Sequence, residues 1–515
     1  MTTALVHGAA LPLAGAPADR LAYTRKGMVL HAVQQAINTS RNALAVEALR
    51  DLIAECPTLA KAHSFLGAAV GRMGDAEAAL EHHERAVELD PADLTIHSTR
   101  IFALDQSGDV TLKRAYRARR AFAERISVDP ATIAPHENDR DPDRRLRIGY
   151  VSADFRNHSA AYGWGPVVLA HSRTDTEVYA YSNNDEEDAR TADFRANVEH
   201  WRDAWRMSDD ALEAQIREDR VDVLVDLSGH SMGHRLEVFA RHPAPVQITA
   251  WGYQTGIGLE GMYLFADDVT IRPDEERWYA EEVIRLPRAL TCWAPDVRAV
   301  GYPGAPPADV NGYLTFGCFN RLGKIQPCVL AAWAEILARL PDARILLKCP
   351  GLDDEAARAE TLRRFEAEGG DARRLDLLGL TPQDEHLRAF HRVDVQLDPS
   401  PHGGGMTTLD AAWMGVPTLT LPHLQIPSRI ATTINRELGL DYLIAADWPD
   451  YVARAVALND QRDELRRVRR LMREMMTVSA FGNHVAYTRA VEATYRALWQ
   501  RWCRGEGPKR LRAVS

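Results

Sequence analysis

The segment YLTFGCFNRLGKIQPCVLAAWAEILARLPDARILLK, residues 313–348, decides the fold. It reads as a short apolar strand (YLTFGCF), a polar turn, an amphipathic helix (PCVLAAWAEILARL) and a second strand (RILLK). Strands that alternate with helices predict a parallel sheet with helices on both faces. The turn FNRLGKIQP leaves the carboxyl end of the first strand, which is the edge where such sheets bind ligands.

The same alternation extends in both directions along the chain. Downstream come the strands LDLLG, DVQLDPS and PTLTLP with helices between them, and upstream, from Leu146, come LRIGYVSADF, EVYAYS, VDVLVDLSGH, PVQITAWGY and VIRLP. The sequence therefore predicts two Rossmann-like α/β lobes, an N-terminal lobe over 146–300 and a C-terminal lobe over 301–480. A cleft between the lobes is expected, and a C-terminal helix and tail over 481–515.

Residues 25–126 predict helical hairpins instead. The best-defined unit is AKAHSFLGAAVGRMGDAEAALEHHERAVELDP, residues 60–91. Three pairs of matching residues are each 34 positions apart: Pro57 and Pro91, Gly74 and Gly108, and Ala45 and Ala79. This period is typical of tetratricopeptide repeats and predicts one strong repeat flanked by two weaker ones, although any amphipathic hairpin is the alternative. The polar, Pro- and Asp-rich residues 127–145 are interpreted as a linker.

Composition narrows the function classes. The net charge of −10 argues against a nucleic-acid partner, which requires clustered Lys and Arg. The six cysteines form no C-x-x-C pair and no zinc-binding spacing, so we expect mostly buried thiols and a reducing compartment. No stretch approaches the roughly 20 apolar residues of a membrane span, and no basic leader opens the chain. A cytoplasmic location is expected.

The strongest candidate site is PSPHGGGMTTLDAAWMGVP, residues 399–417. Glycines such as Gly404 and Gly405 permit close backbone approach, and amides at the start of the following helix attract phosphate. The hydroxyls of Thr407 and Thr408 can donate to phosphate oxygens, and Asp410 can accept from a ribose hydroxyl. These features predict a nucleotide diphosphate site. The alternative is a purely structural glycine-rich turn followed by a threonine N-cap.

Two further loops carry candidate residues. In CFNRLGKIQP, Lys324 can neutralise a departing diphosphate and Arg321 can assist, although a lone lysine is usually a surface residue. In SADFRNHSA, His158 can orient an acceptor or relay a proton, and a structural histidine is an equal alternative.

Five ordered motifs after the repeats now carry a resemblance. LRIGYVSADFRNHS, VDVLVDLSGHSMGHR, PAPVQITAWGYQTG, FNRLGKIQP and GGGMTTLDAAWMGVP resemble the O-GlcNAc transferase/SPINDLY family over roughly residues 146–460. The resemblance implies a GT-B fold and an inverting glycosyltransferase that needs no metal. It further implies transfer of a sugar from a nucleotide donor, by default UDP-GlcNAc, to Ser or Thr of a protein acceptor.

The resemblance also assigns roles by motif. His158 matches the family's active-site histidine, Lys324 the lysine that binds the donor diphosphate, and Arg321 a donor-contacting position. His386 matches a histidine near the donor base. The segment that binds diphosphate and ribose is matched by Thr407, Thr408 and Asp410. The chain departs from the family pattern at Gln254, Met262 and Met406, and these changes leave the donor sugar open.

Alternatives remain at this stage. The donor can be GDP-fucose or another bacterial activated sugar, with flagellin or another surface protein as acceptor. A tetratricopeptide scaffold with an inactive transferase lobe is a reading of another class, and a GT-B epimerase fits the repeats poorly. Three visible repeats favour a narrow acceptor range or self-association through the repeats as a homo-oligomer.

Overall fold

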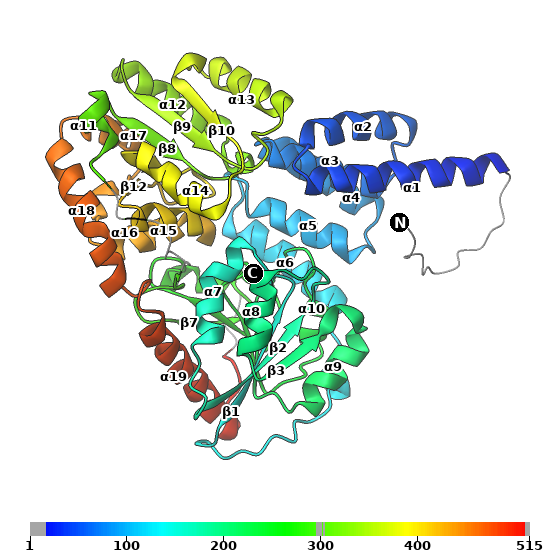
Figure 1. Cartoon of the computed structure of the whole chain (residues 1–515). Coiled ribbons are helices and arrows are strands. Elements are labelled where there is room, and N and C mark those ends of the chain that lie inside the picture. The colour runs from blue at the N-terminus through cyan, green and yellow to red at the C-terminus, as the bar shows by residue number, and fades with distance from the viewer. Residues whose placement is uncertain (1–16, 295–300, 302–303, 510–515) are drawn as a thin grey trace.

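The computed structural model describes residues 17–294, 301 and 304–509, and side chains from residue 25 onward. A helical segment lies beside two α/β lobes, which are stacked one above the other in Figure 1. The predicted boundary between the lobes, at residues 300 and 301, falls in a stretch that is largely outside the described residues.

Three helical hairpins form the N-terminal segment. Its helices are α1 (Pro17–Asn38), α2 (Asn42–Glu55), α3 (Ala60–Arg72), α4 (Ala76–Leu89), α5 (Leu94–Leu104) and α6 (Leu112–Ile126). Helices α3 and α4 coincide with the strong predicted repeat. They touch at Gly67, where an added Cβ atom would lie 2.8 Å from the carbonyl oxygen of Ala79. A small residue is therefore required for this close helix pairing.

The N-terminal lobe is a seven-stranded parallel sheet in the order β3-β2-β1-β4-β5-β6-β7. Its strands are β1 (Leu146–Ser152), β2 (Thr176–Ser182), β3 (His200–Asp203), β4 (Val223–Asp226), β5 (Val246–Thr249), β6 (Tyr263–Ala266) and β7 (Glu282–Arg285). Strands β3 and β6 are missing from the sequence-based expectation. β3 is a half-exposed edge strand, HWRD, with three polar residues out of four, and β6 is an unbroken, fully buried apolar run, YLFA, so neither shows the alternation of a strand.

Helices cover both faces of this sheet. They are α7 (Ser159–Leu169), α8 (Ala189–Asn197), α9 (Asp209–Glu218) and α10 (Leu236–Phe239).

The C-terminal lobe is a five-stranded parallel sheet in the order β10-β9-β8-β11-β12. Its strands are β8 (Thr315–Cys318), β9 (Arg344–Lys348), β10 (Leu375–Leu378), β11 (Val395–Leu397) and β12 (Thr418–Leu419). Its helices are α11 (Pro307–Asn311), α12 (Pro327–Arg339), α13 (Glu355–Ala367), α14 (Gln383–Ala389), α15 (Met406–Trp413), α16 (Ile430–Glu437), α17 (Trp448–Ala457) and α18 (Arg462–Val478). Two lobes of this kind form a GT-B fold, as predicted.

The last helix, α19 (His484–Cys503), returns to the N-terminal lobe, whereas α18 runs along the C-terminal lobe (Figure 1). The ring of His171 bonds Glu492 of α19 at 2.9 Å, and the hydroxyls of Tyr150 and Tyr495 are 3.1 Å apart. The end of the chain therefore ties the two lobes together.

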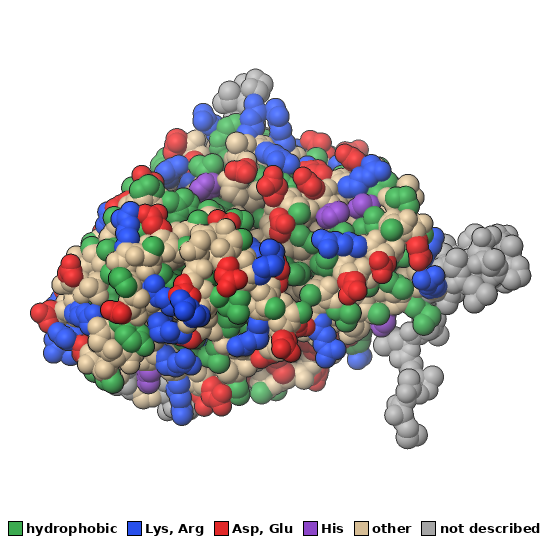
Figure 2. Space-filling view, turned by 90° about the horizontal axis from the view of Figure 1, so that it is seen from above, with side chains coloured by type: hydrophobic (Ala, Val, Ile, Leu, Met, Phe, Trp, Pro, Cys, Tyr) green, Lys and Arg blue, Asp and Glu red, His purple; other side chains and the backbone are tan. Residues whose placement is uncertain are grey.

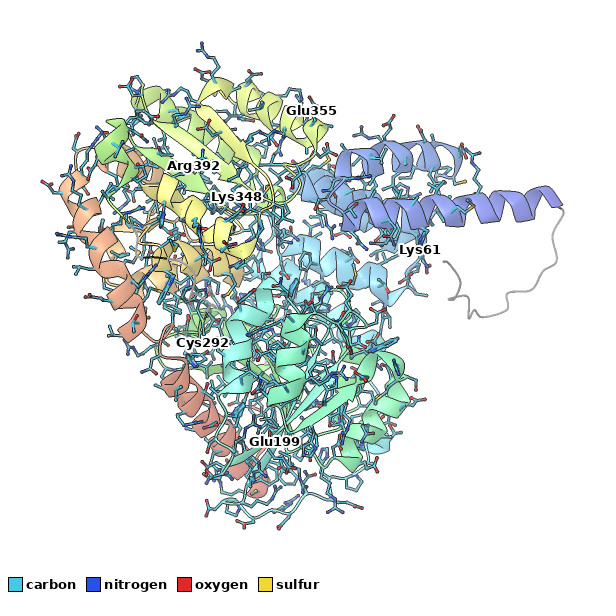
Figure 3. All side chains as sticks on the ribbon, viewed as in Figure 1. Lys61, Glu199, Cys292, Lys348, Glu355 and Arg392 are labelled. Atoms are coloured by element: carbon cyan, nitrogen blue, oxygen red, sulfur yellow. The ribbon has the colours of Figure 1, made fainter. Side chains whose placement is uncertain are left out.

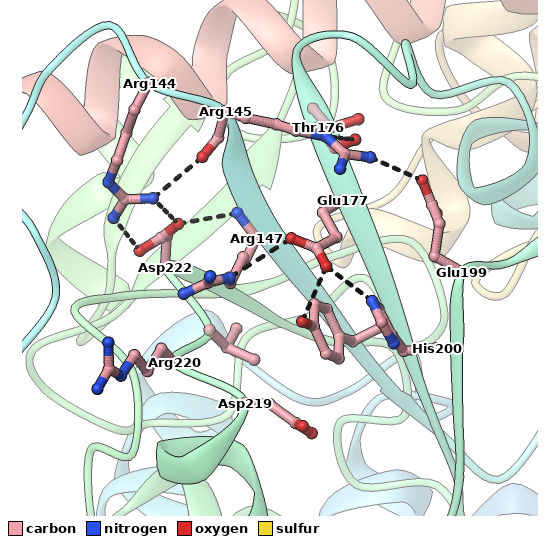
Figure 4. A network of polar contacts seen from close by, with 12 residues as sticks. Arg144, Arg145, Arg147, Thr176, Glu177, Glu199, His200, Asp219, Arg220 and Asp222 are labelled. Atoms are coloured by element: carbon pink, nitrogen blue, oxygen red, sulfur yellow. Dashed lines mark hydrogen bonds and ion pairs between the residues drawn. The ribbon is translucent and has the colours of Figure 1, made fainter.

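The polar segment 127–145 is docked along its length rather than a free spacer. Arg144 forms a two-point ion pair with the buried Asp222, at 2.5 and 2.8 Å, and the amide of Arg147 donates to the same carboxylate (Figure 4). The indole of Trp499 in α19 donates to the carbonyl of Asp141 at 3.0 Å.

The loop between α5 and α6 and the residues next to it contact both lobes. The buried carboxylate of Asp105 pairs with Arg119 and accepts hydrogen bonds from Tyr253 and Thr255 of the N-terminal lobe. One residue later, the carbonyl of Gln106 accepts a bond from Gln326 of the C-terminal lobe at 2.8 Å. The helical segment is thus part of the same packed body as the two lobes.

The outer surface carries mixed charge. On the face in Figure 2, basic and acidic side chains are interspersed. Within the described part of the chain, no helix is both long enough and apolar enough to span a bilayer.

Candidate functional site

The candidate residues lie in three loops at equivalent places in the two sheets. Strand β1 is flanked by β2 and β4, and β8 is flanked by β9 and β11, so the strand order reverses at β1/β4 and at β8/β11. His158 follows β1, Arg321 and Lys324 follow β8, and the glycine-rich loop follows β11. Ligands of open parallel sheets bind at such reversal points. We call the residues of these three loops the interlobe site.

Lys324 ends the short 3-10 helix η4 (Leu322–Lys324), directly after β8. Its ammonium donates to the carbonyl of Gly403 at 2.6 Å and to Oδ1 of Asn320 at 3.3 Å. Asn320 Oδ1 also accepts a bond from the hydroxyl of Thr407 at 3.2 Å. The loop after β8 and the loop after β11 are therefore joined through Lys324 and Asn320.

The glycine-rich loop forms a narrow polar cradle. A Cβ atom added at Gly404 would lie 2.6 Å from Oγ1 of Thr407 and 2.9 Å from Oγ1 of Thr408. The hydroxyl of Thr408 is buried without a partner among the described residues. Gly405 precedes α15, whose first amides have no carbonyl partner within the helix. Donors that converge on a space without a side chain suit an anion.

Asp398, at the end of β11, holds this loop in place. Its carboxylate accepts bonds from the amide of Gly404 at 2.6 Å and from the hydroxyl of Thr420 at 2.8 Å. Burial raises the pKa of Asp398 to about 6. Burial and the charge of Arg321 together lower the pKa of Lys324 to about 7. Lys324 is therefore partly uncharged near neutral pH, and a bound anion would favour its charged form.

Arg321 stands at the N-cap of η4 with an exposed side chain and, among the described residues, no carboxylate partner. Loss of water around the guanidinium, as the surrounding protein partly buries it, lowers the pKa of Arg321, and the charge of Arg72 lowers it further. Arg321 in turn helps to lower the pKa of His158 and of His402, after burial, so these groups lie near one another. Arg321 therefore interacts electrostatically with Arg72 of the helical segment, with His158 of the N-terminal lobe and with Lys324 of the C-terminal lobe.

His158 caps α7 and contacts Asp154, with 3.4 Å between Nδ1 and the carboxylate. Burial lowers the pKa of His158 and raises that of Asp154. The imidazole is 42% exposed, so a ligand can reach it. Met406, which opens α15, packs on the same helix: a Cβ atom added at Gly163 would lie 3.2 Å from its Cε. Helix α7, which His158 caps, therefore packs against the start of α15, directly after the glycine-rich loop.

His386 of α14 lies in an aromatic pocket with Phe319 and Phe390, at ring distances of 5.6 and 5.7 Å. Its Nδ1 is 3.2 Å from the ammonium of Lys348, which is labelled in Figure 3. Its Nε2 is 3.7 Å from Asp410 of α15. An aromatic face beside a carboxylate suits a nucleoside, with the base on the ring and the ribose on Asp410.

The structure thus brings together the predicted residues and adds others. Asn320, Asp398, Lys348 and Trp293 were not predicted; the indole of Trp293 donates to Asp410 at 3.2 Å. Asn320 and Asp398 each lie within six residues of a predicted site residue, and this closeness in the sequence is the feature by which they could have been found.

The three residues that depart from the family pattern, Gln254, Met262 and Met406, lie in different surroundings. Met262 is fully buried in the core, away from the three site loops, and Gln254 adopts a left-handed backbone conformation with φ of 67°. Met406 alone of the three lies at the interlobe site. Across the described residues, no group of three or more His, Cys, Asp or Glu side chains is arranged to hold a metal ion.

Comparisons with known proteins agree with this geometry. The model of glycosyl transferase family 41 matches residues 96–293 and 309–491. The chain is 33% identical over 428 residues to a protein from Solanum lycopersicum named as a probable UDP-N-acetylglucosamine–peptide N-acetylglucosaminyltransferase SPINDLY, covering 82% of this chain and 46% of that protein. It is 28% identical over 384 residues to the Arabidopsis thaliana protein named SEC, covering 72% of this chain and 39% of the relative. The chain spans about half the length of the curated relatives it matches.

Among solved structures, a mutant of the Thermobaculum terrenum O-GlcNAc transferase superimposes with a TM-score of 0.87. The sequence identity is 34%, and the match covers 94% of this chain and 93% of that chain. The helical segment is therefore included in the likeness along with both lobes. From the family match, the shared fold and the arrangement of the site, the chain belongs to glycosyltransferase family 41.

Proposed function

We propose that the chain transfers a sugar from a nucleotide donor to Ser or Thr hydroxyls of a protein, with inversion at the anomeric carbon. UDP-GlcNAc is the donor proposed first, because the relatives are named for N-acetylglucosamine transfer. The observation that carries the proposal is the cradle of Lys324, Thr407 and Thr408 around Gly404. It offers one cation, two hydroxyls and helix amides to a diphosphate.

In the proposed reaction the acceptor oxygen bonds to the anomeric carbon as the bond from that carbon to the diphosphate oxygen breaks. The electron pair of the broken bond stays on the diphosphate, and Lys324 and the helix amides stabilise that charge. Protein cations, rather than a metal ion, are proposed for this role. His158 is proposed to orient the hydroxyl, whose proton passes to the imidazole or to water.

The donor base is proposed to lie on the imidazole of His386, which packs edge-on against the buried Phe319 and Phe390, with the ribose on Asp410. The Lys348 ammonium bonded to His386 Nδ1 fixes the imidazole with its Nε2 toward Asp410. This pocket accepts a pyrimidine or a purine face, so GDP-fucose and other activated sugars remain the second candidates.

Isothermal titration with UDP and with GDP, followed by mass spectrometry of Ser/Thr peptides incubated with the matching nucleotide sugar, tests the proposal. Binding of one nucleotide, at least tenfold weaker in Lys324→Met, together with a peptide mass increase of one sugar residue, supports it. Binding of neither UDP nor GDP, and no peptide modified, would favour a scaffold with an inactive transferase lobe.

A further inference from the structure

The helical segment places an arginine beside the interlobe site that nothing in the proposed reaction uses. Arg72 is the last residue of α3. A Cβ atom added at Gly323 would lie 2.7 Å from the carbonyl oxygen of Gly71 and 3.4 Å from Cα of Arg72. The end of α3 is therefore in direct backbone contact with η4, two residues from Arg321.

Arg364 of the C-terminal lobe stabilises the contact between the end of α3 and η4. The guanidinium of Arg364 in α13 donates to the carbonyls of Met73, Gly74 (3.1 Å) and Ile325 (2.8 Å), which lie just after α3 and just after η4. One side chain of the C-terminal lobe thus clamps the two loops together. The backbone next to Arg72 is therefore held in place by the hydrogen bonds of Arg364.

The side chain of Arg72 itself is exposed, and one of its nitrogens donates to the carbonyl of Ile37 at 2.6 Å. Neither Arg72 nor Arg321 has a carboxylate partner in the part of the chain that the structure describes. Two arginines held together without an acid repel each other, and the charge of Arg72 lowers the pKa of Arg321. An anion bound between them relieves that repulsion.

The two arginines belong to different parts of the molecule: Arg321 follows β8 in the loop that carries Lys324, and Arg72 ends α3 of the helical segment. After burial, the charge of Arg321 contributes to the lowered pKa of Lys324, His158 and His402. Arg72 approaches η4 from the helical segment, where the end of α3 contacts Gly323. The open donors of Arg72 are offered to a group other than the diphosphate.

We propose that Arg72 and Arg321 form an acceptor subsite that binds an Asp or Glu carboxylate near the modified hydroxyl, so that the helical segment selects acidic acceptor sequences. Planar guanidinium groups bind carboxylates through paired hydrogen bonds, which gives direction as well as charge. This inference rests on the proposed function for its acceptor, and it adds the chemistry by which that acceptor is chosen.

The test uses two fluorescein-labelled peptides that share one Ser and differ only in Asp and Glu against Asn and Gln around it. Fluorescence anisotropy measures their binding to the full chain in the presence of saturating nucleotide. The acidic peptide is expected to bind about fivefold more tightly, a value in the upper range for partly exposed ion pairs. Arg72→Ala removes that preference, and Arg72→Lys retains part of it.

Two further variants make the test decisive. Arg72→Glu is expected to reverse the preference toward a matched peptide with Lys and Arg, which loss of folding alone cannot do. Arg50→Ala, an exposed arginine of α2, is the control and keeps the wild-type preference.

Nucleotide titration separates the other outcomes. Equal binding of both peptides to wild type overturns the subsite even if sugar transfer is observed. Weaker nucleotide binding in Arg72→Ala, with the peptide preference intact, assigns Arg72 to the donor instead and overturns the proposal. Absence of sugar transfer to any peptide contradicts the proposed function, while anisotropy still reads the subsite.

Discussion

Binding of a nucleotide sugar should draw a proton into the interlobe site through Lys324. In the unliganded protein, burial and Arg321 hold the pKa of Lys324 at about 7, so at pH 8 only about a tenth of the lysine is charged. A diphosphate favours the charged ammonium and raises that pKa. With a bound-state pKa above about 9.5, binding at pH 8 takes up about 0.9 proton.

The sign of the pH dependence follows. A pKa that is higher in the complex makes binding weaker as pH rises above the pKa of the free protein. From pH 7 to pH 8.5 the affinity should fall about 15-fold, and Asp398, with a pKa of about 6, stays ionised through this window. A nucleotide sugar is the ligand used, because its diphosphate diester does not titrate in this range.

The assay is isothermal titration at pH 8 in two buffers of different ionisation enthalpy, which reports the number of protons taken up. Lys324→Met should bind about 10- to 100-fold more weakly, the cost of one charged hydrogen-bond donor, with uptake near zero. Lys61→Met, an exposed lysine of α3, is the control. Equal proton uptake by wild type and Lys324→Met, or a flat affinity from pH 7 to 8.5, would refute the reasoning.

Three other changes give distinct outcomes. Gly404→Ala should weaken nucleotide binding at least tenfold, because the new methyl group lies 2.6 Å from Oγ1 of Thr407; titration calorimetry measures this. Asp105→Asn should lower the free energy of unfolding by about 3–5 kcal/mol in urea titration, since Arg119 keeps a buried charge without its partner. His83 has a pKa lowered to about 4 by burial, so stability is complete above pH 6.5 and falls in acid, by about 2 kcal/mol at pH 5; His83→Leu should remove this share.

The Gly404 prediction has a control variant, and the Asp105 and His83 predictions each have a result that would contradict them. Gly27→Ala adds a methyl group with nothing within 4 Å and should leave nucleotide binding unchanged. For the Asp105 prediction, an unchanged urea midpoint would show that the link between the helical segment and the lobes contributes little. For His83, the same slope of stability against pH in wild type and His83→Leu would show that other groups set the acid sensitivity.

The architecture could be predicted from periodicity because each element buries its own apolar face. The 34-residue period gave α3 and α4, and the alternation of apolar strands with amphipathic helices gave the two sheets. The polar β3 and the apolar β6 were missed because neighbouring strands, rather than an alternating pattern of their own, fix their positions in the sheet.

The interlobe site was partly predictable for a related reason. Parallel strands end at one edge, so loops after β8 and β11 had to lie near each other, and Lys324 does meet Gly403. The placement of Arg72 could not be predicted, because the end of α3 meets the loop of Arg321 only through the docking of segments about 250 residues apart in the chain. The role of Asp105 in joining the helical segment to the N-terminal lobe depends on the same tertiary packing.

Sugar transfer itself tests the central claim most directly. Purified protein would be incubated with Ser/Thr peptides and, in separate reactions, UDP-GlcNAc and GDP-fucose, and the peptides analysed by mass spectrometry with electron-transfer fragmentation. The account predicts the mass of one sugar on a Ser or Thr oxygen from one donor, with inverted anomeric configuration, and its loss in Lys324→Met. A protein that binds the nucleotide yet modifies no hydroxyl with either donor, or a Lys324→Met variant that is fully active, would contradict it.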